Sequence, residues 1–152
     1  MHASHTWRST RTRWAAGLMV ASAAAGCGSN TPADPTDPSS SLAGSYHATV
    51  FNVTPTGQAA IDVLAANGSL AITIGAANAL SGLLSIPASV TGGSALNADM
   101  AGTVVVTGAA VTFQQNADTF VRDLEWTRVG TSLTVVAQAA GSASFTITLA
   151  RL

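Results

Sequence analysis

The sequence predicts an all-β domain over residues 42–152, an antiparallel up-and-down meander that closes as a barrel of about eight or nine strands. Apolar residues alternate with Thr, Ser or Gln along short segments, as in 110–115 and 145–150, which is typical of half-buried antiparallel strands. Turn residues separate these segments, among them Asn67-Gly68 and Gly92-Gly93. Closing the meander into a barrel removes the unpaired edge strands.

The expected strands follow one another with connections that are mostly short. They span residues 44–53, 58–65, 69–75, 79–86, 99–107, 110–115, 119–128, 132–138 and 143–151. The alanine-rich segment 57–68 has some helical propensity, but its length and its flanking turn residues favour a strand. A β-sandwich is the alternative fold; it needs a longer crossover, for which 87–98 is the only candidate.

A resemblance to a known family rests on the runs "GSYHATVFNV", "GSLAITI", "DMAGTVVVTGAAVTFQQ" and "SFTITLARL". Together they resemble the lipocalin-like β-barrel domains of bacterial lipoproteins, over most of residues 42–152. Tyr46 stands in "GSY" where secreted lipocalins carry the Trp of a Gly-x-Trp motif. The resemblance implies a barrel whose interior is either filled or holds one small apolar or amphipathic ligand.

The first residues have the pattern of a lipoprotein signal peptide, which we expect to span 1–26. Arg8, Arg11 and Arg13 precede the uncharged apolar run Ala15–Ala25. A basic segment, a short apolar run and small residues at its end are typical of a secretory signal. The apolar run is shorter than the roughly 20 residues that a transmembrane helix needs.

The only cysteine of the chain, Cys27, follows this run directly. The segment "AAGC", residues 24–27, resembles a bacterial lipobox, which implies cleavage before Cys27 and attachment of a lipid to its sulfur. Residues 27–41 then form a linker rich in Pro and Ser. We expect a lipid-anchored protein of the bacterial cell envelope, on the periplasmic face of the outer membrane where there is one. Cleavage after Ala25 would instead release a soluble secreted protein.

Charge excludes one class of partner. After cleavage the chain keeps three arginines against seven carboxylates, a net charge of −4. Such a domain lacks the positive surface that a nucleic-acid phosphate backbone requires. The membrane is therefore expected to be reached through the lipid on Cys27. The sequence makes no prediction of the oligomeric state.

The densest polar stretch, 117–128, supplies the candidate ligand-binding residues. Read as one strand, it places Phe120, Arg122 and Trp126 on the inner face, and Tyr46 faces the same interior from the first strand. An inward guanidinium needs a partner. We expect either an ion pair with Asp62 or Asp99, or an Arg122 that meets the carboxylate of an amphipathic ligand.

No pattern in the sequence predicts catalysis, a metal site or a cofactor. His47 is the single histidine of residues 42–152, and no serine lies in a nucleophile-elbow motif, so a strand-surface histidine is the expected role. The carboxylates do not have metal-ligand spacing. The expected function is binding of a small apolar or amphipathic ligand. The alternative is a non-enzymatic structural or interaction lipoprotein.

Overall fold

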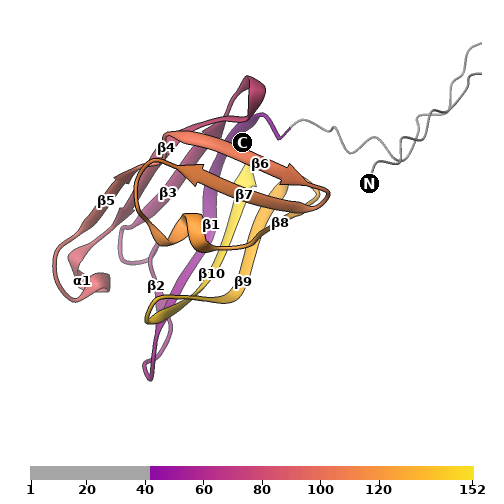
Figure 1. Cartoon of the computed structure of the whole chain (residues 1–152). Coiled ribbons are helices and arrows are strands. Elements are labelled where there is room, and N and C mark those ends of the chain that lie inside the picture. Colours follow the sequence, from indigo (N-terminus) through magenta and orange to yellow (C-terminus); the bar gives the residue numbers. More distant parts are fainter. Residues whose placement is uncertain (1–41) are drawn as a thin grey trace, which may run out of the picture. The chain divides into compact units, whose positions relative to one another are not determined.

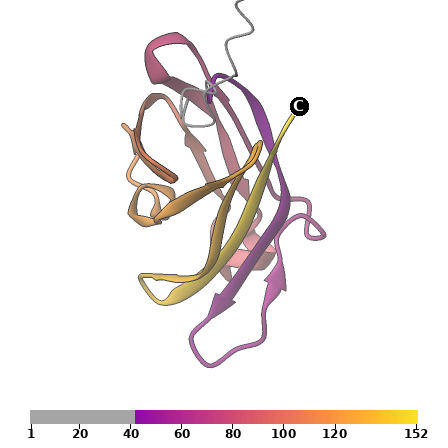
Figure 2. The same cartoon turned by 90° about the vertical axis from the view of Figure 1, so that its right-hand side faces the viewer.

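A computed structural model describes residues 42–152; the predicted signal peptide 1–26 and the linker 27–41 with Cys27 lie outside the described residues. The domain is built almost entirely of strands (Figures 1 and 2). They are β1 (Gly44–Pro55), β2 (Ile61–Asp62), β3 (Ser69–Ile74), β4 (Ala79–Ile86), β5 (Leu96–Asp99), β6 (Gly102–Thr107), β7 (Ala110–Gln115), β8 (Trp126–Val129), β9 (Ser132–Ala140) and β10 (Ala143–Arg151). Three short helical segments connect some of them: η1 (Ala76–Asn78), α1 (Ala88–Thr91) and η2 (Phe120–Asp123).

Eight of the strands form a closed antiparallel barrel. Their order is β1-β3-β4-β6-β7-β8-β9-β10, and β10 pairs with β1 to complete the circle. The two extra strands lie beside β1 (β2) and beside β4 (β5). The closing pairing runs from Tyr46↔Arg151 to Pro55↔Ala143. This confirms the predicted up-and-down barrel and decides against a sandwich.

The predicted strand 99–107 is divided by a break at Met100 and Ala101. On the near side of the break Leu83 pairs with Asp99, and on the far side Leu80 pairs with Gly102. The Met100 amide donates to the carbonyl of Gly82 at 3.0 Å, so the register beside β4 is continuous from β5 into β6. The Asp99 carboxylate accepts a hydrogen bond from the Ala101 amide at 2.9 Å and so occupies a backbone donor at the break.

The predicted strand 58–65 is wrong in extent, since only Ile61–Asp62 pairs. The Asp62 carboxylate accepts hydrogen bonds from the amides of Leu64 and Ala65, at 2.9 and 3.1 Å. An acidic side chain that accepts hydrogen bonds from nearby backbone amides stabilises a turn, and this turn competes with pairing to a neighbouring strand.

The candidate crossover 87–98 contains α1 and β5 rather than a Greek-key connection. Within residues 42–152 no helix has the length and apolar character to cross a bilayer.

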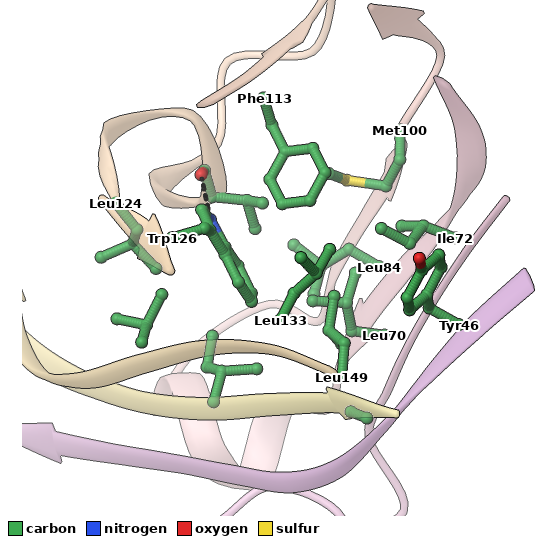
Figure 3. Packing of buried hydrophobic residues seen from close by; sticks show 14 of the residues in the cluster. Tyr46, Leu70, Ile72, Leu84, Met100, Phe113, Leu124, Trp126, Leu133 and Leu149 are labelled. Atoms are coloured by element: carbon green, nitrogen blue, oxygen red, sulfur yellow. Dashed lines mark hydrogen bonds between the residues drawn. The ribbon is translucent and has the colours of Figure 1, made fainter. Parts of the chain in front are cut away.

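Inward-facing side chains fill most of the barrel (Figure 3). The alternation predicted for β3, β7 and β10 is confirmed: every second residue is buried in β3 and β7, and at positions 145, 147 and 149 in β10. The largest fully buried side chains are those of Trp126, Tyr46, Phe51, Phe113, Leu70, Ile74, Leu84, Met100, Leu124, Leu133, Ile147 and Leu149. Together they form one packed core inside the barrel.

Candidate functional site

A cavity of about 170 Å³ opens at one mouth of the barrel. Two cross-strand pairs frame it: Val53 of β1 lies opposite Phe145 of β10, and Ile86 of β4 lies opposite Leu96 of β5. Helix α1, which connects β4 to β5, adds Val90 and Thr91, and η2 adds Phe120. The cavity is therefore assembled from six elements that meet only because the barrel closes.

Phe120 forms the aromatic wall of this cavity together with Phe145. The two rings are stacked, with centroids 4.1 Å apart and planes at 9°. Phe51 lies behind Phe120, with ring centroids 6.3 Å apart. Offset or stacked aromatic pairs contribute about 0.5–1.5 kcal/mol beyond their buried area. The stack therefore holds Phe120 at the mouth although its connection is not a strand.

Two buried hydrogen bonds fix the connection that carries Phe120. The Gln115 side-chain amide donates to the Thr119 hydroxyl at 2.9 Å, at the start of η2. The Trp126 indole N–H donates to the carbonyl of Val121 at 3.1 Å, on the other side of Phe120. Buried polar groups that are paired in this way hold a loop in one conformation. Hydrogen bonds therefore fix the residue before Phe120 and the residue after it.

The chemistry of the cavity is apolar. Thr91 is the single polar residue among those that line it, and its hydroxyl already donates to the Ser94 carbonyl at 2.8 Å. An engineered protein cavity of about 150 Å³ with apolar walls stays dry and binds benzene. Pockets for drug-sized ligands are larger, about 300–1,000 Å³. The cavity therefore suits one small apolar group, with no charge to recognise a carboxylate.

The predicted inward position of Arg122 is wrong. Its side chain is 42% exposed and forms an ion pair with Asp118, four residues earlier in the chain, and a second contact with Asp123 at 3.9 Å. The physical reason is the shape of the segment: Phe120–Asp123 forms a 3-10 turn, so the two-residue alternation of a strand does not apply. The expected pairing with Asp62 or Asp99 is also wrong, since both carboxylates bind nearby backbone amides.

Tyr46 and Trp126 face the interior as predicted, but in the packed core rather than at the cavity. Both are almost fully buried (Figure 3). The Tyr46 hydroxyl donates to the Leu42 carbonyl at 2.8 Å, and the Trp126 ring meets Phe113 edge-to-face at 5.1 Å between centroids. Of the four residues predicted to bind a ligand, Phe120 alone lines the cavity.

The other lining residues were not predicted from the sequence. The nearest signal was the segment 87–98, which contains Val90, Thr91 and Leu96 and is the longest connection between predicted strands.

His47 lies on β1 and faces away from Tyr46, and its Nδ1 is buried without a hydrogen-bond partner. Among residues 42–152 no three His, Cys, Asp or Glu side chains come together as a metal site would require.

The fold and the cavity define a class, a closed eight-stranded up-and-down β-barrel with a small apolar cavity at one mouth. Comparison of the chain with protein-family models, with curated proteins and with solved structures found no significant match.

Proposed function

We propose that this protein is an exported, lipid-anchored β-barrel that binds a small apolar group in the cavity at its mouth. The observation that carries the proposal is the cavity itself, where apolar side chains from six elements surround about 170 Å³ of space in an otherwise packed barrel. The side chains around an empty cavity lack van der Waals contacts on one side, which destabilises the fold. A bound apolar group would supply these contacts.

The ligand is a compact hydrocarbon group or the apolar end of an amphipathic molecule. The cavity volume admits a group about the size of a substituted benzene ring or a short acyl segment. The packed core behind Phe51 and Phe120 prevents a longer chain from entering the barrel. Any polar part of the ligand therefore stays outside the mouth, in water.

Export and anchoring are supported by the N-terminal sequence. Three arginines precede an uncharged run, and Cys27 follows the small residues Ala25 and Gly26. A lone cysteine in an oxidising compartment needs a use, and a thioether to lipid is one. Each acyl CH₂ buried in a membrane contributes about 0.8 kcal/mol, so an N-terminus with several chains is a stable anchor.

Binding is tested by titrating toluene into the ¹³C-methyl-labelled protein and following the NMR signals of Ile86, Val90 and Leu96. We expect these methyl signals to shift, while those of Ile74 and Leu80, outside the cavity lining, stay in place. The variant Val90→Phe fills the cavity from the half-buried side of α1 and is expected to abolish the shifts. Val136→Phe, at a 77% exposed position on β9, is the matched control and keeps them. Shifts that are equal in both variants, or absent from the unchanged protein, would overturn the proposal.

The anchor is tested separately by mass spectrometry of the protein extracted from membranes of a bacterial host. The expected mass is that of residues 27–152 plus acyl groups. A chain that begins at Gly26 without acyl mass contradicts the anchor and leaves the cavity proposal untouched.

The packed interior supports a second candidate, a non-enzymatic lipoprotein that acts through its outer surface on another component of the envelope. Two dozen apolar residues are buried in one cluster, which leaves the mouth cavity as a small fraction of the barrel. Toluene that leaves the methyl signals of the cavity unchanged would favour this candidate.

A further inference from the structure

The connection that carries α1 along the cavity is joined to the barrel by side-chain packing alone. Its two ends are fixed, because Ile86 of β4 pairs with Leu96 of β5. Between them, no hydrogen bond joins residues 87–95 to any other part of the described chain 42–152. Figure 1 shows this connection at the end of the β4–β5 pair. The segment can therefore move without breaking a ladder between strands.

One apolar side chain holds α1 against the barrel. Val90 is half-buried, lines the cavity and packs against the apolar core, whereas every other residue of 88–95 is exposed. The segment reads ASVTGGSA, so it has no charged side chain to form an ion pair. Few buried apolar contacts and an exposed backbone are the properties of segments that open locally while the rest of the domain stays folded. We therefore expect α1 to open more readily than the strands.

Two glycines after α1 provide a hinge. Gly92 ends the helix in the left-handed region, with φ +70°, and its amide donates to the Ala88 carbonyl at 3.0 Å. A Cβ atom at Gly92 or Gly93 would meet nothing within 4 Å, so no neighbouring group restricts the backbone here. On the other side of α1 the ring of Pro87 fixes φ, at −70°. Rotation at the glycines therefore moves Val90 relative to the cavity while β4 and β5 stay paired.

We propose that α1 is a lid on the cavity, hinged at Gly92 and Gly93, which opens to admit a ligand and closes on it through Val90. A bound apolar group adds contacts to the Val90 side chain, so the ligand favours the closed lid. The opposite wall is fixed, since the ring of Phe120 is stacked on that of Phe145. The inference rests on the proposed binding function for what the lid encloses, whereas the opening of the lid is measurable without a ligand.

Amide hydrogen exchange followed by NMR tests the lid without and with toluene. The Gly92 amide is released when the hinge rotates, so we expect it to exchange at least about 100-fold faster than the amide of Leu84 in the core. Toluene at ten times its Kd should slow this exchange about tenfold, because it binds the closed lid. The Gly68 amide, which donates to Val63 outside the cavity lining, should keep its rate.

Two results would show that α1 is not a lid. One is a Gly92 amide that exchanges as slowly as that of Leu84, and the other is a Gly92 rate that bound toluene leaves unchanged. Failure of the proposed binding function is seen separately, as cavity methyl signals that toluene does not shift. In that case the exchange rate of the ligand-free protein still reports whether the segment opens.

The variants Gly92→Ala and Gly93→Ala separate a lid from a fixed wall, since neither glycine lines the cavity. Alanine at position 92 disfavours the closed lid because L residues rarely adopt its φ, whereas position 93 carries no such strain. We expect Gly92→Ala to raise the association and dissociation rates of toluene about tenfold each, measured by exchange broadening of the Ile86 and Leu96 methyl signals. Kd should change less than about twofold, because the closed lid remains the main form. Gly93→Ala should keep both rates, and equal rates in the two variants would contradict the hinge.

Discussion

The ring of Phe120 lies parallel to that of Phe145, 4.1 Å away, although one comes from a 3-10 turn and the other from the last strand of the barrel. Phe145 is fixed by its pairing with Val53 across the β1–β10 closure. The stack therefore couples the loop after β7 to the closing ladder. It also sets the size of the mouth cavity, since both rings line it.

Truncation of Phe120 to Ala is expected to destabilise the domain and enlarge the cavity. A fully buried Phe→Ala change costs about 3–5 kcal/mol, and Phe120 is only partly buried, so we expect a loss of about 2 kcal/mol. Urea unfolding measures this change, and 1-methylnaphthalene, which is larger than toluene, should shift the Ile86 and Leu96 methyl signals more in Phe120→Ala than in the unchanged protein. Phe120→Leu is the matched control, expected to lose less than about 1.5 kcal/mol. If Phe120→Ala keeps full stability, the stack does not hold the loop.

The barrel could be predicted from the sequence because apolar and polar residues alternate along its strands. This two-residue period follows from the extended backbone alone. Phe145, Ile147 and Leu149 of β10 are all buried, as their spacing indicates. The same rule failed at 119–128, where the buried residues Val121 and Leu124 are three positions apart. That spacing is the signal of a helical turn that the strand interpretation passed over.

The cavity could not be predicted from the sequence, because no single segment contains it. Val53 and Phe145 meet through a ladder between residues far apart in the chain, and Ile86 and Leu96 meet only once β5 folds back on β4. These registers depend on how the whole barrel closes. Tyr46 and Trp126 were correctly placed inside, yet the sequence does not say which end of the interior stays empty.

The surface position of Arg122 predicts a small role in stability. Its partner Asp118 has an 89% exposed side chain, and pairs in water contribute about 0–1 kcal/mol. Arg122→Ala is therefore expected to lower the free energy of unfolding by less than about 1 kcal/mol. Urea unfolding at low and high salt checks this. A loss of several kcal/mol would be the behaviour of a buried guanidinium and would contradict the exposed ion pair.

Trp126 is expected to be essential to the core and to report on it. It is 1% exposed, packs edge-to-face on Phe113 and donates a hydrogen bond to Val121. Trp126→Phe keeps much of the packing but leaves the Val121 carbonyl without this donor, so we expect a loss of about 1–3 kcal/mol. A double-mutant cycle with Phe113→Leu should give a coupling of about 0.5–1.5 kcal/mol for the ring pair. Additive effects would show that the two rings do not interact.

Within residues 42–152 Trp126 is also the single tryptophan, so its fluorescence reads the barrel interior directly. We expect blue-shifted emission and slow quenching by acrylamide in the folded protein, since its side chain is enclosed by the core. The two other tryptophans, Trp7 and Trp14, belong to the predicted signal peptide and have to be absent from the sample. Emission at the wavelength of a solvated indole would contradict the buried position.

Gly82 is expected to tolerate no side chain, because β3 crosses β4 too closely at this point. A Cβ atom there would meet the carbonyl oxygen of Ala71 and would lie 2.7 Å from the Cα of Ile72, and the backbone has φ +144°, which L residues rarely adopt. Both contacts are with backbone, which cannot move aside without breaking the β3–β4 ladder. Gly82→Ala should therefore lower the free energy of unfolding by about 2–4 kcal/mol. Gly93→Ala is the matched control: a Cβ meets nothing within 4 Å there, and the expected change is within about 0.5 kcal/mol. Equal unfolding midpoints in urea for the two variants would show that the strands are not in the register described.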